Sequence, residues 1–367
     1  MLLDYRDITH PEAGGAEVYL NEIFQRIAAH GHRVTLLSGR YRGASPEERI
    51  GGIRVLRIGN KATQNVVAAR AALRLARTEQ VDLFVENICK IPFLLPVFTR
   101  IPVLPIVLHL FGWTVFYEAN PAFASYVWLY ERLIPLVYRG RRFVAISDST
   151  ARDLVGRGLR NSQIDIVSPG LELTRYCSDA DVPKSEQPLL LYVGMLKRYK
   201  GIDTMIRAFA RVRAAVPGAR LALAGKGNDR PRLEALVRTL GLTDCVSFEG
   251  WVSDERKIDF LRRASALVYP SVKEGWGIPT MEAAACATPT LASDVAGLRD
   301  AVRDGITGFL IPHQDIDAWA RRMTEILTDP PLRARLGAAA QAWARGFGWD
   351  VQAEKMRATV EAVAKGQ

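Results

Sequence analysis

Short apolar runs alternate with longer amphipathic stretches along almost the whole chain. Runs of four to eight apolar or β-branched residues are typical of buried strands, and apolar residues spaced three and four apart are typical of covering helices. Their alternation predicts parallel sheets with crossover helices. In the first half, the predicted strands are 2–5, 33–38, 53–58, 82–86, 103–109, 142–147 and 163–167. The predicted helices there are 16–29, 64–78, 124–138 and 148–156.

The alternation resumes in the second half, after a stretch at 168–188 that is rich in Ser, Pro and Asp. The predicted strands are 189–193, 220–224, 246–249, 266–269 and 290–292. The predicted helices are 201–215, 230–240, 254–264 and 279–286, followed from residue 316 by a mostly helical tail with a break at 346–349.

This order predicts an α/β chain with two doubly wound, Rossmann-like domains. We expect an N-terminal domain of residues 1–170, a linker at 171–187 and a C-terminal domain of residues 188–345. Open α/β sheets bind ligands at the carboxyl ends of their strands, so the expected ligand site is a cleft between the two domains.

The stretch 101–117 is the only one that approaches a membrane span, with 17 residues and no formal charge. It contains Pro102, Pro105, His109 and Gly112. Because parallel strands are apolar on both faces, we interpret it as a buried strand that leads into a loop.

Composition narrows the function classes. The chain has 49 Lys and Arg against 39 Asp and Glu, a net charge of +10, and this excess is spread over both halves. That distribution argues against a nucleic-acid module and is compatible with phosphate ligands. The four cysteines form no C-x-x-C pair, which predicts reduced thiols in a cytoplasmic protein, and no signal peptide is apparent at the amino terminus.

Paired glycines follow the first predicted strand. Gly14 and Gly15 open the first helix, and side-chain-free residues at a helix amino terminus let a phosphate approach the backbone N–H groups. A tight turn without ligand is the alternative interpretation.

Three cations follow the first strand of the second half. Lys197, Arg198 and Lys200 come just before the next helix, where they can neutralise a diphosphate. A solvated basic loop is the alternative.

The most specific loop begins at Glu274 and ends at Glu282. Pro279 is placed to start a helix, so Glu274 lies in a loop and Glu282 on the first turns of that helix, directed at the same space. Carboxylates and free loop N–H groups bind vicinal sugar hydroxyls. A surface loop acid and a helix-dipole acid are the alternatives. The loop residues between them are Gly275, Trp276, Gly277 and Ile278.

His109 comes at the end of a predicted apolar strand. A histidine there is often structural, but at a strand end opposite the Glu274 loop it would face a reacting sugar.

Eight motifs in this order resemble the blocks of the family-4 retaining glycosyltransferases, which have the GT-B fold, over nearly the whole chain. They are HPEAGGAEVY (10–19), AISDSTARDL (145–154), VSPGLE (167–172), VGMLKRYKGID (193–203), LALAGKG (221–227), VSFEGWV (246–252), EGWGIPTMEAAACATP (274–289) and DGITGFLIP (304–312). The resemblance implies an acceptor-side first domain, a nucleotide-sugar-binding second domain, and a closing helix at 349–367 that crosses back onto the first.

The resemblance also implies roles for the matching positions. Gly14 and Gly15 would contact the donor diphosphate, Lys200 would bind its phosphates, Glu282 would hold the ribose hydroxyls, and Glu274 would contact the transferred sugar. His109 would lie close to the anomeric carbon. One position departs from the family pattern, because Met195 stands where an arginine usually follows the glycine of the phosphate loop.

These implications predict a metal-independent retaining transferase without a cofactor. It would move a hexose from a UDP- or GDP-linked donor to an acceptor hydroxyl during polysaccharide, glycolipid or other glycoconjugate synthesis. The two Asp-x-Asp sequences, at 179–181 and 315–317, fall in the linker and the tail, away from the expected site. The alternatives are a catalytically weak nucleotide-sugar-binding protein of the same fold, and an inverting transferase or epimerase, which the Glu274 loop fits poorly.

Basic residues also suggest a peripheral contact with the inner face of an anionic membrane. Arg70, Arg74 and Arg77 recur on one helical face. A second group, Arg139, Arg141 and Arg142, follows an aromatic-rich helix, so the first domain would rest on lipid and receive a glycan, small-molecule or lipid-linked acceptor. A solvated basic face is the alternative.

Overall fold

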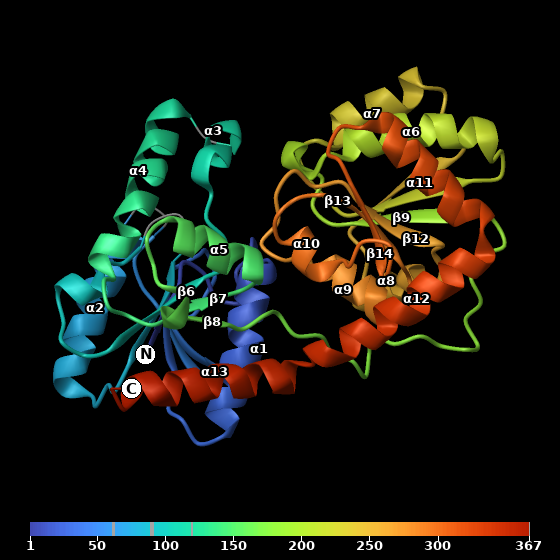
Figure 1. The fold of residues 1–367 in the computed structure, drawn as a ribbon. Coiled ribbons are helices and arrows are strands. Elements are labelled where there is room, and N and C mark those ends of the chain that lie inside the picture. The colour runs from blue at the N-terminus through green and yellow to red at the C-terminus, as the bar shows by residue number, and fades with distance from the viewer. Residues whose placement is uncertain (61–62, 89–91, 119, 367) are drawn as a thin grey trace. The chain divides into compact units, whose positions relative to one another are not determined.

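The computed structural model describes residues 1–60, 63–88, 92–118 and 120–366 of the 367-residue chain (Figure 1). The chain divides into two compact units. The first contains residues 1–170 together with 349–367, and the second contains residues 171–348. Each unit is built around one twisted sheet with helices on its faces (Figure 1).

The first unit holds an eight-stranded sheet in the order β3-β4-β2-β1-β5-β6-β7-β8, in which every pairing is parallel except β3 with β4. Its strands are β1 (Leu2–Leu3), β2 (Thr35–Ser38), β3 (Glu47–Ile50), β4 (Ile53–Arg57), β5 (Phe84–Ile88), β6 (Val103–Val107), β7 (Phe143–Ala145) and β8 (Ile164–Ile166). The sequence did not predict β3, because this exposed edge strand carries three charged residues and no apolar pattern.

Five helices between the strands and one at the chain end cover this sheet. They are α1 (Gly15–Ala29), α2 (Gln64–Thr78), α3 (Val115–Glu118), α4 (Pro121–Val137), α5 (Asp148–Gly156) and α13 (Trp349–Ala364). Helix α13 packs against α1, and Arg26 of α1 donates to Asp350 at 2.7 Å (Figure 1). Gly170 permits this return, because a Cβ there would lie 2.5 Å from the ring of Trp349.

The second unit holds a six-stranded, all-parallel sheet in the order β11-β10-β9-β12-β13-β14. Its strands are β9 (Leu189–Val193), β10 (Arg220–Ala224), β11 (Val246–Gly250), β12 (Ala266–Tyr269), β13 (Thr290–Ser293) and β14 (Gly308–Ile311). Its helices are α6 (Ile202–Ala215), α7 (Arg230–Thr239), α8 (Asp254–Arg263), α9 (Ile278–Ala285), α10 (Leu298–Ala301), α11 (Ile316–Thr328) and α12 (Pro330–Ala344). The prediction missed β14, whose four residues begin with a glycine.

The apolar stretch at 101–117 forms β6, which is buried between β5 and β7, and then turns into the short helices η2 (Gly112–Thr114) and α3. Its interpretation as a buried strand leading into a loop is therefore confirmed at β6. None of the helices within the described residues is long and apolar enough to cross a membrane.

Candidate functional site

The second sheet reverses its direction of growth at β9. This strand lies between β10, which follows it in the chain, and β12, which the chain reaches only after β11. Ligands of open α/β sheets bind outside the carboxyl ends of the strands at such a reversal. The loops that follow β9 and β12 therefore form the candidate site, and they carry Lys200 and Glu274.

These two loops touch through their backbones. The backbone N–H of Val272 donates to the carbonyl of Tyr199 at 2.8 Å. Gly201, with φ 64°, caps the start of α6, and a Cβ at this position would lie 2.3 Å from the carbonyl oxygen of Pro270. Only glycine fits both this conformation and this close approach, so the contact between the two loops depends on Gly201.

Lys200 is buried and paired. It ends the short helix η4 (Arg198–Lys200), is 5% exposed, and donates from Nζ to the carboxylate of Glu274 and to the hydroxyl of Tyr269 at 3.3 Å. Burial alone would lower the pKa of Lys200, but Tyr269 and Glu274 outweigh it and hold that pKa well above its ordinary value. The cation and the carboxylate singled out in the sequence thus lie in direct contact.

Other residues of the first loop are partly open to solvent. Arg198 is exposed, Lys197 is half-buried, and no ion pair joins either one to an acidic side chain in the described part of the chain. Met195 is 49% exposed, and its carbonyl accepts a hydrogen bond from the hydroxyl of Tyr192 at 2.9 Å. Two cations therefore follow the exposed Met195 within three residues on the same loop.

The second loop, which follows β12, is held by packing contacts. The ring of Trp276 is buried and packs 5.3 Å from that of Phe347, so its side chain belongs to the support of the loop. Gly277, with φ 89°, caps α9, and Ile278 is the first residue of that helix. Gly275 lies against Gly297, where a Cβ would come within 2.8 Å of the Gly275 carbonyl oxygen. The loop backbone is held on both sides.

Glu282 lies on α9 and is nearly buried. Its carboxylate accepts from Nζ of Lys257 on α8 at 2.9 Å, and this ammonium also lies 5.0 Å from the ring centroid of Tyr176. Burial lowers the pKa of Lys257, but Glu282 and Tyr176 raise it by more, so the lysine remains charged. The two carboxylates of the candidate site are thus paired with two different lysines.

In the first unit the predicted glycines lie at a similar reversal, since β1 is flanked by β2 and β5. Gly14 caps α1, and Gly15 is the first residue of the helix. The N–H of Gly14 already donates to the carboxylate of Glu17 at 2.7 Å. A side-chain anion therefore occupies the place at this helix amino terminus where the sequence predicts a phosphate.

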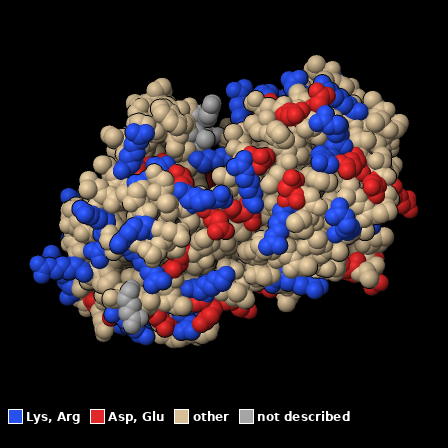
Figure 2. Space-filling view, in the orientation of Figure 1, with Lys and Arg blue, Asp and Glu red and all other residues tan. Residues whose placement is uncertain are grey.

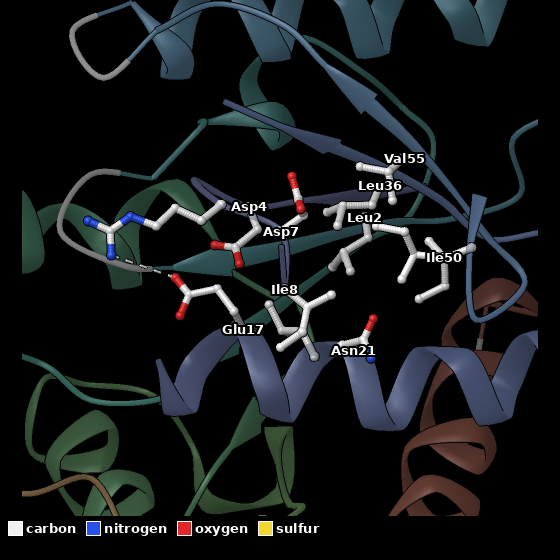
Figure 3. Close-up of a pocket in the computed structure, with 12 residues that line it drawn as sticks. Leu2, Asp4, Asp7, Ile8, Glu17, Asn21, Leu36, Ile50 and Val55 are labelled. Carbon is white, nitrogen blue, oxygen red and sulfur yellow. Dashed lines mark ion pairs between the residues drawn. The ribbon is translucent and has the colours of Figure 1, made fainter. Parts of the chain in front are cut away.

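A second carboxyl lies beside Glu17. Figure 3 shows Asp4 next to Glu17 at one end of a small pocket, with Asp7 further along it. Burial, followed by the neighbouring charge of Glu17, raises the pKa of Asp4 to about 7, although Oδ1 of Asp4 accepts a hydrogen bond from the side chain of Asn87 at 2.8 Å. Asp4 is thus a buried acid that titrates near neutrality.

His109 follows β6 by two residues, in a segment held by a glutamate. The His109 ring lies 4.6 Å from the ring of Phe111, at an edge-to-face angle. The N–H groups of Phe111 and Gly112 donate to the two carboxylate oxygens of Glu131 on α4 at 2.6 and 2.8 Å, and Arg157 contacts the same carboxylate at 3.4 Å. Glu131 therefore fixes the chain just after His109.

The Asp-x-Asp sequences have structural partners. Asp179 pairs with Arg262 at 3.0 Å, and Asp317 pairs with Arg211. Within the described ranges, no three His, Cys, Asp or Glu side chains cluster as metal ligands would. Three cysteines are free thiols, and the fourth, Cys89, lies outside the described residues.

Sequence reasoning missed Lys257, Tyr176, Tyr269, Glu131 and Glu17. Lys257 lies in a helix with six other charged residues, so nothing in the local pattern distinguishes it. Glu17 was readable as the third helical residue of a capping box. The contact of Glu131 with the loop twenty residues earlier has no local signal.

Two family models together match most of the chain. "Glycosyl transferases group 1" matches residues 178–343, and "Glycosyltransferase Family 4" matches residues 13–175. The chain belongs to the family-4 glycosyltransferases. This membership confirms the family resemblance seen in the sequence motifs.

Relatives of known name agree with this family. D-inositol 3-phosphate glycosyltransferase from Kribbella flavida is 33% identical over 230 residues, covering 58% of this chain and 54% of that protein. The one from Nocardia farcinica is 35% identical over 234 residues, covering 60% and 52%. The chain thus spans about half the length of the curated relatives it matches.

The fold is shared with solved structures over both units. Sucrose-phosphate synthase from Thermosynechococcus elongatus matches with a TM-score of 0.84 and 23% identity, covering 100% of this chain and 99% of that one. Anabaena HepE, solved in complex with UDP-glucose, matches with a TM-score of 0.77 and 18% identity, covering 98% of each chain. These likenesses show the GT-B fold, as the sequence predicted.

Proposed function

We propose that this family-4 protein is a retaining glycosyltransferase that moves a hexose from a UDP- or GDP-linked donor to an acceptor hydroxyl in glycoconjugate synthesis. The observation that carries the proposal is the contact between Lys200 and Glu274 at the reversal of the second sheet. A buried cation beside a carboxylate is suited to a ligand that carries both phosphate and sugar hydroxyls. Relatives whose names include a sugar transfer, and a similar structure solved with UDP-glucose, support this ligand class.

Charge develops on the leaving diphosphate during transfer. Lys200, with Lys197 and Arg198 on the same loop, supplies positive charge there, and the anchored backbone after Glu274 supplies fixed N–H groups. In this proposal the departing phosphate oxygen accepts the proton of the acceptor hydroxyl on the same face of the sugar, which retains the anomeric configuration. Glu282 holds the ribose hydroxyls, and His109 acts from the first unit near the anomeric carbon.

The proposal includes metal independence, because protein cations take the place of a divalent ion at the diphosphate. Incubation with UDP-glucose, GDP-mannose and a panel of acceptors, with and without EDTA, tests it. We expect equal rates in both conditions, and an α-linked product by NMR from an α-linked donor. Loss of transfer in EDTA with recovery on Mg²⁺ would refute metal independence, and a β-linked product would refute retention.

A specific observation favours a second candidate. Met195 presents an exposed apolar side chain where family members usually carry an arginine, so the protein would bind nucleotide-sugars with weak catalysis. The substitution Met195→Arg separates the candidates. If transfer is the function and Lys197 or Arg198 supplies the charge, the variant changes kcat by less than about threefold. A gain of about a hundredfold, the size of one missing oxyanion contact, would favour the weak binder.

We also propose a peripheral contact between the first unit and an anionic bilayer. Five apolar side chains that are 40–69% exposed recur every three or four residues along α4, namely Phe123, Tyr126, Leu129, Leu133 and Leu136. Trp113, in the preceding segment, is 68% exposed. Figure 2 shows a largely uncharged surface in the region of α4, at the upper left, with Lys and Arg side chains below it. An exposed aromatic and aliphatic stripe of this kind suits the lipid interface.

Sedimentation with anionic lipid vesicles tests this contact. The substitution Leu129→Glu/Leu136→Glu places two carboxylates on the stripe and should reduce the vesicle-bound fraction at least about tenfold. Val351→Glu is the matched control, because Val351 is 49% exposed on α13. Equal sedimentation of wild type and the double variant would remove α4 from the contact.

A further inference from the structure

A groove on the first unit lies apart from the loops described above. It has a volume of about 480 Å³ and runs between α2 and the strands β3 and β4. Ligand sites commonly have volumes of roughly 300–1,000 Å³, so the groove is large enough for a small organic molecule. The residues that line it include Leu37, Arg40, Arg70, Ala71, Arg74 and Leu75.

The floor of the groove is apolar and its border is basic. Leu37 is buried, and Ala71 and Leu75 are half-buried on the face of α2 that borders the groove. Arg70 and Arg74, one turn apart on α2, are both exposed. Two cations therefore border an apolar surface whose exposure to water is unfavourable.

The other charges around the groove are already paired. Arg57 is fully buried and bonds Asp7 at 2.8 Å and Glu48 at 2.9 Å. Glu47, the acidic residue that lines the groove, accepts from Arg54 at 2.7 Å. The nearby carboxylates therefore do not neutralise the arginines of α2.

Arg70 and Arg74 have no acidic partner among the residues whose placement is described. The sequence of α2, QNVVAARAALRLART, contains no acidic residue. Like charges at i and i+4 destabilise a helix by a few tenths of a kcal/mol, roughly 0.2–0.5. An anion between the two guanidinium groups would offset this repulsion. Arg40, whose Nε donates to the Arg57 carbonyl at 2.9 Å, adds a third cation.

We infer that this groove binds a phosphate group carried on an apolar body, with Arg40, Arg70 and Arg74 on the phosphate and the apolar floor beneath the body. Phosphate is preferred over a carboxylate because three guanidinium groups match its larger charge and its three terminal oxygens. The site is independent of the proposed sugar transfer, since none of its residues belongs to the loops that carry Lys200, Glu274 or His109.

Two sources supply this chemistry, namely the headgroup of an anionic lipid in a bilayer and a soluble organic phosphate. The probe that distinguishes them is dihexanoyl phosphatidic acid, used as a monomer, beside bilayer vesicles that contain long-chain phosphatidic acid. Inorganic phosphate and dihexanoyl phosphatidylcholine serve as comparison ligands for titration calorimetry with the full chain.

The test variant is Arg70→Gln/Arg74→Gln, which removes the like-charge pair and should keep the fold. We expect it to weaken binding of the monomeric probe about a hundredfold, at about tenfold for each charge-assisted contact. Arg77→Gln, on the same helix but outside the groove lining, should stay within twofold of wild type. Ala71→Phe, which fills the floor without changing charge, should also weaken the probe.

The vesicle experiment identifies the source. Arginine-dependent binding of the monomer assigns a soluble ligand, and arginine-dependent binding to vesicles alone assigns a bilayer headgroup. Equal affinity of wild type and Arg70→Gln/Arg74→Gln in both experiments would overturn the site. Binding of inorganic phosphate as tightly as the probe would overturn the role of the apolar floor.

Discussion

The Lys200 and Lys257 pairs of the second unit and the exposed residues of α2 and α4 in the first unit differ in how their side chains are partnered. In the second unit, the buried Lys200 is paired with the half-buried Glu274, and the buried Glu282 is paired with the half-buried Lys257. In the first unit, Arg70 and Arg74 of α2 are exposed without an acidic partner in the described ranges, and apolar side chains of α4 face solvent. Buried pairs hold a fixed geometry for a small ligand, whereas unpaired surface groups suit a larger or looser partner.

The strongest test of this comparison removes one member of a buried pair. Lys200→Met leaves the carboxylate of Glu274 without its cation, which should lower the free energy of unfolding by about 3–5 kcal/mol. It should also reduce kcat/KM for sugar transfer about a thousandfold, through lost charge at the leaving diphosphate. Urea unfolding and steady-state transfer assays measure both effects.

Two further variants keep this prediction informative. Lys355→Met removes an exposed lysine of α13 and should change neither quantity. Lys200→Met/Glu274→Gln removes both charges, so it should recover much of the stability but none of the activity. Recovery of activity in that double variant would show that the pair only supports the fold.

The first unit offers a contrasting case, the buried carboxyl of Asp4, which forms no ion pair within the described ranges. The pKa of Asp4 is raised from 3.8 to about 7, so the folded chain keeps this proton at pH values where the unfolded chain has lost it. The contribution of this proton to the free energy of unfolding is therefore fully present below about pH 4. It is lost as the pH rises to about 7, which lowers the free energy of unfolding by up to about 4 kcal/mol.

Asp4→Asn should abolish that loss. The variant should match wild type at pH 4 and exceed its unfolding free energy at pH 8, as measured by urea unfolding across the range. Asp181→Asn, at an exposed position, is the control. A constant difference between Asp4→Asn and wild type at all pH values would show that Asp4 does not titrate in this window.

The segment after His109 depends on Glu131 for its position. Glu131→Gln keeps one oxygen for the N–H groups of Phe111 and Gly112 and loses the charge that holds Arg157. We expect kcat to fall about ten- to thirtyfold, about 1.4–2 kcal/mol, with KM for the donor unchanged. A rise in donor KM with an unchanged kcat would place Glu131 in donor binding instead.

The smallest expected effect is the coupling between Lys257 and Glu282. Lys257→Met should weaken donor binding about tenfold, because Glu282 loses the ammonium that orients it at 2.9 Å. A double-mutant cycle with Glu282→Gln should give a coupling energy of about 1–2 kcal/mol. Arg256→Met, on the neighbouring exposed position of α8, is the control, and additive effects in the cycle would contradict the pairing.

Much of the fold was predictable because it rests on local patterns. Strands β9, β10 and β12 and helices α2 and α5 have the predicted bounds, since apolar runs and capping residues mark them clearly. The edge strand β3 was not predictable, because it forms by backbone pairing with β4 and its sequence has no apolar pattern. The loop residues of the candidate site could be identified from the glycines and the family motifs.

Side-chain contacts between different structural elements were not predictable. The contact of Lys257 with Glu282 joins helices that flank β12, and that of Glu131 with Gly112 joins a helix to an earlier loop. Such contacts depend on strand order and helix packing, which no local pattern encodes. The sequence also could not show that Arg70 borders a groove.

The central claim is that the second unit binds a nucleotide-sugar through Glu282 and the Lys200 loop. Titration calorimetry of UDP-glucose and GDP-mannose against wild type and Glu282→Ala tests it most directly. We expect wild type to bind at least one of these donors, and Glu282→Ala to lose at least about a hundredfold in affinity while its circular dichroism spectrum stays unchanged. Wild-type affinity in Glu282→Ala would contradict the claim.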